Sequence, residues 1–183
     1  MSFPALMRNG NVLAVSLLAL LLSACAHSAG SYDALAPLPP GGSLIQYTSL
    51  HMEATNKNEI PMTSIDRDRL LNKIVRKLQV TNRYKEIGAA TSGPGTLYAT
   101  IEFTDYDSGN AFLRFLLAGL GQIHIDGILT LEDRGKSTPL AKYEVNKTFA
   151  WGGFYGMGTK IEDVEEGFVE AVAEILLEKN KPN

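Results

Sequence analysis

The sequence predicts one α+β domain over residues 43–183, built as two layers with helices on one face of a mixed, largely antiparallel sheet. Two observations predict this class. Apolar residues alternate with polar ones in several central segments, as in strands that bury one face. Apolar residues recur at helical spacing in one segment near the start and one at the end of the domain. The predicted order is β-α-β-β-β-β-α.

The first half of the domain supplies a strand, a helix and a second short strand. A strand is expected at 44–54. Thr63 then begins a helix, and Asp66 three residues later gives the spacing of a capping box. A short strand at 84–87 follows, before a Gly/Pro turn at 89–95. The apolar face of the helix comprises Ile65, Leu71, Ile74, Val75 and Leu78.

The second half supplies three strands and a terminal helix. Alternation predicts strands at 97–103, 122–132 and 141–151, the last two as an antiparallel hairpin. Thr159 and Glu162 are spaced as a second capping box, and Glu165 and Glu166 are expected on the exposed side of this helix. Its apolar face comprises Ile161, Val164, Phe168, Val172, Ile175 and Leu176.

The N-terminal segment has the three parts of a secretory signal: a basic residue, a short apolar run and small residues before a cleavage point. The chain has a single cysteine, Cys25, and it ends the run 22–25 (Leu-Ser-Ala-Cys), which resembles a bacterial lipobox. We therefore expect residues 1–24 to be a lipoprotein signal peptide and Cys25 to carry fatty acyl groups, palmitate among them, as a membrane anchor. The alternative is an ordinary secretory signal with a cysteine near its end by chance.

Residues 26–42 are rich in Ala, Ser, Gly and Pro and lack periodicity, so 25–42 is expected to be the lipidated cysteine followed by a flexible tether. The residue after Cys25 is Ala26 rather than Asp, which by resemblance to Gram-negative lipoproteins implies the outer membrane, facing the periplasm. The net charge of −3 argues against a nucleic-acid partner. Attachment to the membrane must then come from the acyl chains.

The segment 111–121 has apolar residues around nearly the whole circumference of a short helix, between Asn110 as a cap and Gly119 as an end. Such a helix must be covered on all sides. The functional interpretation is a contact surface for a protein partner or for another copy, or a patch on the nearby membrane; the alternative is an extra element of the core. The candidate contact residues are Phe112, Leu113, Arg114, Phe115, Leu116, Leu117 and Leu120.

The segment 151–158 combines three aromatic residues with four glycines. It lacks the Lys-Ser/Thr of a P-loop, so phosphate binding is not indicated. One interpretation is a flexible link into the last helix. The other is the rim of a ligand site formed by Trp151, Phe154 and Tyr155.

No motif in the sequence nominates a catalytic residue, because the sequence lacks HExxH, GxSxG and SxxK patterns. His124 and Asp126 share one face of a strand, but two ligands at this spacing are a weak metal signal. We therefore expect no enzyme, no cofactor and no metal site.

Two runs carry a resemblance to a known family: 107–114 (Asp-Ser-Gly-Asn-Ala-Phe-Leu-Arg) with 117–121 (Leu-Ala-Gly-Leu-Gly), and the strand 123–133 that follows. They resemble an uncharacterised bacterial lipoprotein family known only as a domain of unknown function, number four-four-one-zero. The predicted element order is also similar to the small α+β modules of envelope lipoproteins, which bind proteins. This likeness is at the level of the fold.

Together these features predict an outer-membrane lipoprotein with a non-catalytic protein-binding or assembly module in the periplasm. The alternative is a binding module for peptidoglycan or a small envelope ligand.

Overall fold

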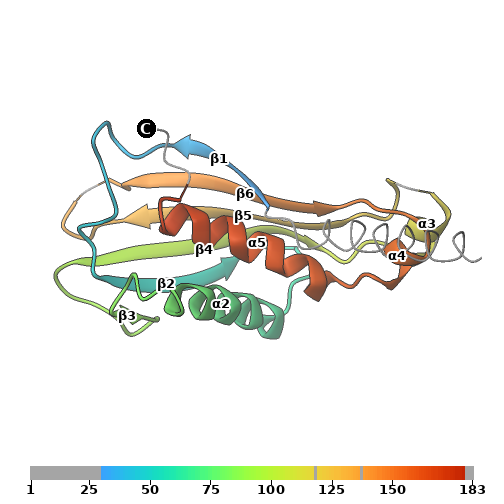
Figure 1. The fold of residues 1–183 in the computed structure, drawn as a ribbon, viewed down its shortest axis with the longest axis horizontal. Coiled ribbons are helices and arrows are strands. Elements are labelled where there is room, and N and C mark those ends of the chain that lie inside the picture. Colours follow the sequence, from blue (N-terminus) through green and yellow to red (C-terminus); the bar gives the residue numbers. More distant parts are fainter. Residues whose placement is uncertain (1–29, 118, 137, 180–183) are drawn as a thin grey trace, which may run out of the picture.

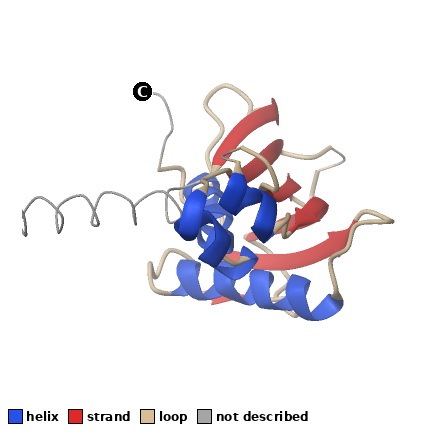
Figure 2. Cartoon of the chain, turned by 90° about the vertical axis from the view of Figure 1, so that its right-hand side faces the viewer, coloured by secondary structure: helices blue, strands red, loops and turns tan. Residues whose placement is uncertain are grey.

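The computed structural model describes residues 30–117, 119–136 and 138–179, and they form one sheet with helices against one face (Figures 1 and 2). The elements are β1 (Ser31–Ala36), β2 (Ser49–Asn56), α2 (Ser64–Gln79), β3 (Glu86–Ile87), β4 (Thr96–Asp107), α3 (Ala111–Leu116), β5 (Ile123–Glu132), β6 (Ala141–Phe149), α4 (Gly153–Gly158) and α5 (Ile161–Leu176).

The sheet has six strands in the order β1-β6-β5-β4-β2-β3. β2 is parallel to β3 and β4, and the other pairs are antiparallel. Figure 1 shows α2 and α5 lying side by side along the same face of the sheet. The α+β class, the mixed sheet and the helices on one face are therefore confirmed. The predicted order β-α-β-β-β-β-α is wrong in three places, because it omits the strand β1 and the short helices α3 and α4.

Alternation along β5 places its odd-numbered residues in the core, as predicted, and all of them are buried. The core is completed by helix side chains such as Ile74 of α2 and Phe168 of α5, which are fully buried. The rings of Phe103 and Phe168 lie 5.6 Å apart between sheet and helix. Gly127 of β5 leaves room for the Phe168 ring, because a Cβ there would lie 3.2 Å from its Cζ.

The capping box of α2 is confirmed. The Thr63 hydroxyl oxygen accepts a hydrogen bond from the Asp66 backbone N–H at 3.2 Å, and the Asp66 carboxylate accepts one from the Thr63 N–H at 3.2 Å. The second capping prediction is wrong by one residue: α5 follows Lys160, whose N–H donates to the Asp163 carboxylate at 2.9 Å. The buried face of helix α2 also differs from the predicted one, because Leu70 is buried and Ile65 is exposed.

The expected tether is partly wrong, because Ser31–Ala36 is an edge strand that pairs with β6. The Gly30 N–H donates to the Gly167 carbonyl at 2.7 Å, and the Tyr32 ring packs edge-on against Tyr143 at 6.3 Å. These contacts are all long-range. Most side chains of β1 are exposed, which leaves no alternation to detect in the sequence.

Glu165 is fully buried, contrary to the expected exposed position. Its carboxylate accepts hydrogen bonds from the Arg69 guanidinium at 2.7 Å and from the Tyr106 hydroxyl at 2.8 Å, and it lies 2.9 Å from the Lys73 ammonium. Burial and the hydrogen bond to Glu165 raise the pKa of Tyr106. The buried carboxylate therefore joins α5 to α2 and β4.

Candidate docking surface

The connection from β4 to β5 forms helix α3, in the segment that the sequence marked as apolar all round. The Asn110 side chain accepts hydrogen bonds from the N–H groups of Phe112 and Leu113, both at 3.0 Å. The chain returns to β5 through Gly121, which has φ +64° and whose added Cβ would lie 2.3 Å from the Asn110 carbonyl oxygen. An L side chain at Gly121 would break this close approach.

Helix α3 and the turn that follows it expose most of their apolar side chains. Phe112 is 64% exposed, and Leu116, Leu117 and Leu120 are also exposed. We call the exposed set the α3 surface: Phe112, Leu113, Leu116, Leu117 and Leu120. The choice between core and exposed surface, left open by the sequence, is settled for these side chains in favour of exposure.

Arg114 is the exception, since it is only 3% exposed. Its Nε donates to the Gly156 carbonyl at 2.8 Å, its Nη1 donates to the Ser108 and Gly121 carbonyls at 2.9 and 2.7 Å, and its Nη2 donates to the Thr159 carbonyl at 3.1 Å. The expectation that Arg114 contacts a partner is therefore wrong. Its guanidinium joins four backbone carbonyls, one from α4 and three from the segments that flank α3 and α4.

Helix α4 follows β6 and packs against α3. The rings of Phe115 and Phe154 lie 5.1 Å apart across this contact. Gly156 is required here, because an added Cβ would lie 2.1 Å from the Trp151 carbonyl oxygen. The two segments singled out in the sequence thus form one unit at one end of the sheet.

The aromatic residues of the second segment divide into two groups. Trp151 and Phe154 are 45% and 79% exposed. Tyr155 is partly buried and its ring packs on Phe149 at 5.7 Å, so it does not form a rim with the other two. We call the exposed side chains Trp151, Phe154 and Met157 the α4 surface, and the α3 and α4 surfaces together the apolar tip.

The apolar tip lies at the end of the sheet where β4 and β6 finish and β5 begins, as Ile123 pairs with Phe149 and Asp107 with His124. Figure 2 looks onto this end, with short helices towards the viewer. All eight exposed side chains of the tip are uncharged. A surface of this kind is typical of a contact site.

The sequence predicted most tip residues but missed the role of Arg114. A signal was present: Arg114 is the lone charge in an apolar run flanked by glycine-containing turns, whose carbonyls need donors. Cys25 lies outside the residues that the structure describes.

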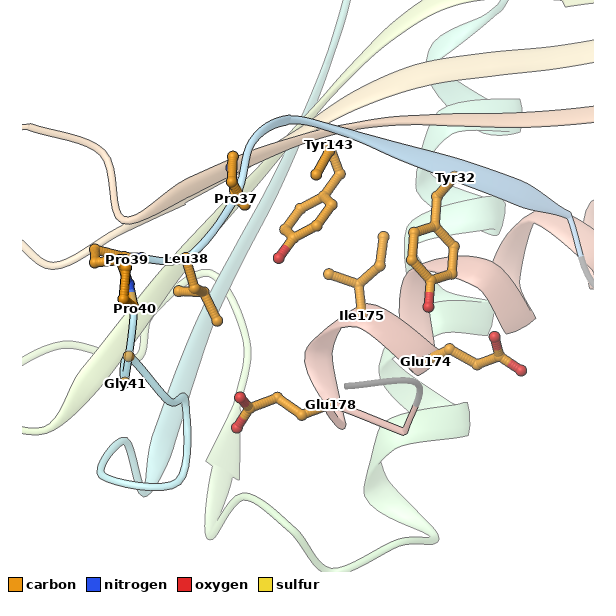
Figure 3. Close-up of a pocket in the computed structure, with 12 residues that line it drawn as sticks. Tyr32, Pro37, Leu38, Pro39, Pro40, Gly41, Tyr143, Glu174, Ile175 and Glu178 are labelled. Carbon is orange, nitrogen blue, oxygen red and sulfur yellow. The ribbon is translucent and has the colours of Figure 1, made fainter. Parts of the chain in front are cut away.

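A cavity of about 430 Å³ lies at the other end of the molecule, between β1, β6 and the end of α5. Figure 3 shows Tyr32 and Tyr143 facing Ile175, with Glu174 and Glu178 at the helix end and Pro37 to Gly41 closing one side. Burial and the neighbouring Tyr32 raise the pKa of Tyr143. Glu178 accepts hydrogen bonds from the Ser43 hydroxyl at 2.8 Å and the Leu44 N–H at 2.9 Å, which ties the loop before β2 to the end of α5.

Within residues 30–117, 119–136 and 138–179, no group of three or more His, Cys, Asp or Glu side chains could hold a metal ion. The His124 ring contacts the Thr148 hydroxyl at 3.1 Å. Burial and the nearby Asp105 raise the pKa of Asp126. In the described part of the chain, the helices are too short or too polar to cross a membrane.

Comparison with known proteins gives one family match and several structural neighbours. The family model "Domain of unknown function (DUF4410)" matches residues 36–153. No curated protein sequence matches significantly. A PelC dodecamer structure from Paraburkholderia phytofirmans aligns at a TM-score of 0.51 and 11% identity, covering 81% of this chain and 96% of that one.

A single-residue variant of the same PelC, also a dodecamer, aligns at a TM-score of 0.50 and 8% identity, covering 80% of this chain and 97% of that one. A Xanthomonas campestris protein of the DUF330 family has a TM-score of 0.46 and 14% identity, covering 83% and 90%. The PelC structures share the fold with this chain.

Proposed function

The chain belongs to the DUF4410 family, and we propose that it is a lipid-anchored, non-catalytic module of the bacterial envelope that assembles through protein–protein contact. The α3 surface is the interface in this proposal. Its five exposed apolar side chains, presented by α3 and the turn that follows it, are the observation that carries it.

Rigidity of the α3 surface supports a role in docking. Arg114 fixes α3 and α4 through four carbonyls, and Asn110 fixes the start of α3, so the surface is ordered before any partner binds. A preorganised surface loses little conformational entropy on binding. Association driven by apolar side chains suits a surface that bears no charge.

Copies of the same chain are the partner that we favour. The PelC structures with the same fold are dodecamers. This supports self-association at the level of the fold alone.

The anchor and the location rest on the leader. Cys25 at the end of an apolar run would carry the acyl chains, and Ala26 after it is compatible with the outer membrane. Two or three acyl chains hold a protein firmly on a bilayer, whereas one chain holds it marginally.

The test is the oligomeric state of residues 26–183, which lack the leader and the acylated cysteine, measured in detergent-free buffer by light scattering after size-exclusion chromatography. We expect an oligomer that the double substitution Phe112→Asp and Leu116→Asp converts to a folded monomer. The matched control is Ile45→Asp, because Ile45 is 75% exposed and lies in the loop after β1, at the other end of the sheet. A wild-type monomer, or an oligomer unaffected by the double substitution, contradicts the α3 interface.

Peptidoglycan binding is the competing outcome, since Trp151 and Phe154 are exposed aromatic side chains. Retention of the chain on purified peptidoglycan, lost on Trp151→Ala, would favour the glycan-binding alternative over assembly.

A further inference from the structure

The described chain begins beside the apolar tip. Gly30 is fixed by its N–H bond to the Gly167 carbonyl at 2.7 Å, and Ser31 pairs with Asn146 of β6. Because β1 is antiparallel to β6, and β6 runs towards α4, the start of β1 points towards the tip. Gly30, where the described chain begins, therefore lies on the tip side of the sheet.

Four residues, 26–29, separate Cys25 from Gly30, the first fixed residue of the domain. The five steps along the chain from Cys25 to Gly30, at 3.3–3.6 Å each, span about 18 Å at most. This is far shorter than a tether that extends to residue 42, because β1 takes up much of that segment.

The tip extends about as far beyond Gly30 as this short segment can reach. From Asn146, beside the start of β1, the strand β6 advances three residues to Phe149, about 10 Å at the rise of a strand, and Trp151 follows two residues later. A bilayer that holds acyl chains on Cys25 would therefore lie within reach of the tip.

The α4 surface is joined directly to the strand that pairs with β1. It follows β6, the immediate neighbour of β1, whereas α3 joins β4 and β5 further across the sheet. Residues 151–158 contain no charged side chain, and Trp151 and Phe154 are exposed. Tryptophan favours the interface between headgroups and acyl chains, because its ring is apolar and its N–H still finds a partner there.

We propose that the α4 surface rests in the interfacial region of the bilayer that carries the Cys25 acyl chains. This inference depends on the lipid anchor of the proposed function. In this orientation Phe154 and Met157 enter beside Trp151, while the α3 surface remains at the side of the tip for contact with protein.

The experiment uses the single tryptophan of the chain, Trp151, as its probe. The full chain is produced in a Gram-negative bacterium, purified from its membranes and reconstituted into vesicles of phosphatidylethanolamine and phosphatidylglycerol, with and without bromine on the acyl chains. Mass spectrometry of the same sample reads the state of Cys25. We expect an acylated cysteine, Trp151 emission at shorter wavelength than in detergent-free water, and quenching by the brominated lipid.

Three outcomes separate the two proposals. An acylated Cys25 with Trp151 emission unaffected by bromine overturns the α4 contact and leaves the anchor intact. A shift to shorter wavelength without quenching places Trp151 against protein and also overturns it. An unmodified cysteine overturns the anchor, and the inference with it.

A pair of variants tests the contact without altering the probe. Phe154→Asp should greatly reduce quenching of Trp151 by brominated lipid, since it places a charge in the interfacial layer. Ile45→Asp should leave quenching unchanged. Equal quenching in Phe154→Asp and the wild type would contradict the proposal, and near-ultraviolet circular dichroism shows that both variants are folded.

Discussion

At the scale of single residues, two of the buried charged residues, Arg114 and Glu165, define how parts of this protein are joined. Arg114 binds only backbone carbonyls, whereas Glu165 binds the side chains of Arg69, Lys73 and Tyr106. Both charged residues can be read from the sequence, but their burial could not be predicted from it. Their hydrogen-bond partners come from segments that are distant along the chain. A pattern of apolar spacing contains no information about such partners.

Replacing Arg114 with Met should destabilise the protein by about 3 kcal/mol, because four carbonyls lose their donor and each unsatisfied buried group costs about 1–3 kcal/mol before relaxation. Urea unfolding at neutral pH measures the loss. The free energy of unfolding of Arg114→Lys should lie between those of Arg114→Met and the wild type, since an ammonium has three donors but lacks the planar geometry of a guanidinium. A free energy of unfolding unchanged in Arg114→Met would show that the guanidinium does not hold the tip.

Tyr84 should make the protein sensitive to alkali. Its hydroxyl donates to the Leu176 carbonyl at 2.8 Å, and burial raises its pKa from 10.0 to about 12. The unfolded chain loses this proton at a lower pH than the folded one. The stabilisation is therefore complete below pH 10 and is lost as the pH rises through about 12.

Urea unfolding between pH 8 and pH 12 should accordingly show a decline that is shallower in Tyr84→Phe than in the wild type. Parallel declines in the two proteins would assign the alkaline sensitivity to other groups.

At the scale of elements, the sequence predicted those strands and helices whose apolar side chains follow a regular period. The strands β4, β5 and β6 and the helices α2 and α5 are of this kind. It missed β1, which is exposed along most of its length and exists through its pairing with β6. Both segments of the tip were recognised, but their packing against each other depends on Arg114 and on the Phe115–Phe154 contact.

The capping box of α2 offers a prediction at this scale. Thr63→Ala should lower the free energy of unfolding by about 1 kcal/mol, because the Asp66 N–H loses its acceptor. The urea midpoint measures it. Thr63→Ser keeps the hydroxyl and should stay near the wild type. If Thr63→Ser and Thr63→Ala lowered the free energy of unfolding equally, the loss of the threonine methyl group rather than of the cap would explain the destabilisation.

At the scale of the whole molecule, the sheet places Gly30 and the apolar tip at one end and the cavity beside Tyr32 and Tyr143 at the other. This polarity could not be predicted from the sequence, because it depends on the register between β1 and β6. Without β1, the chain after Cys25 would be a tether long enough to allow any orientation.

Lengthening the short segment before Gly30 tests this polarity. Inserting twelve Gly and Ser residues after Ala29 should lower the quenching of Trp151 by brominated lipid. A longer flexible linker lowers the effective concentration of the tip at the bilayer surface. Acylation of Cys25 should be unaffected. Undiminished quenching would mean that the α4 surface binds lipid strongly enough without a short linker.

The pairing of the first strand with the last has a consequence for how the protein is made. The ribosome releases Ser31 long before its partner Asn146, and at about 5–20 residues per second the delay is on the order of ten seconds. During that interval β1 has no neighbour, so the nascent amino-terminal region stays accessible to chaperones and processing enzymes. The pairing of β1 therefore requires β6, and the bond of Gly30 requires Gly167, both of which are synthesised near the end of the chain.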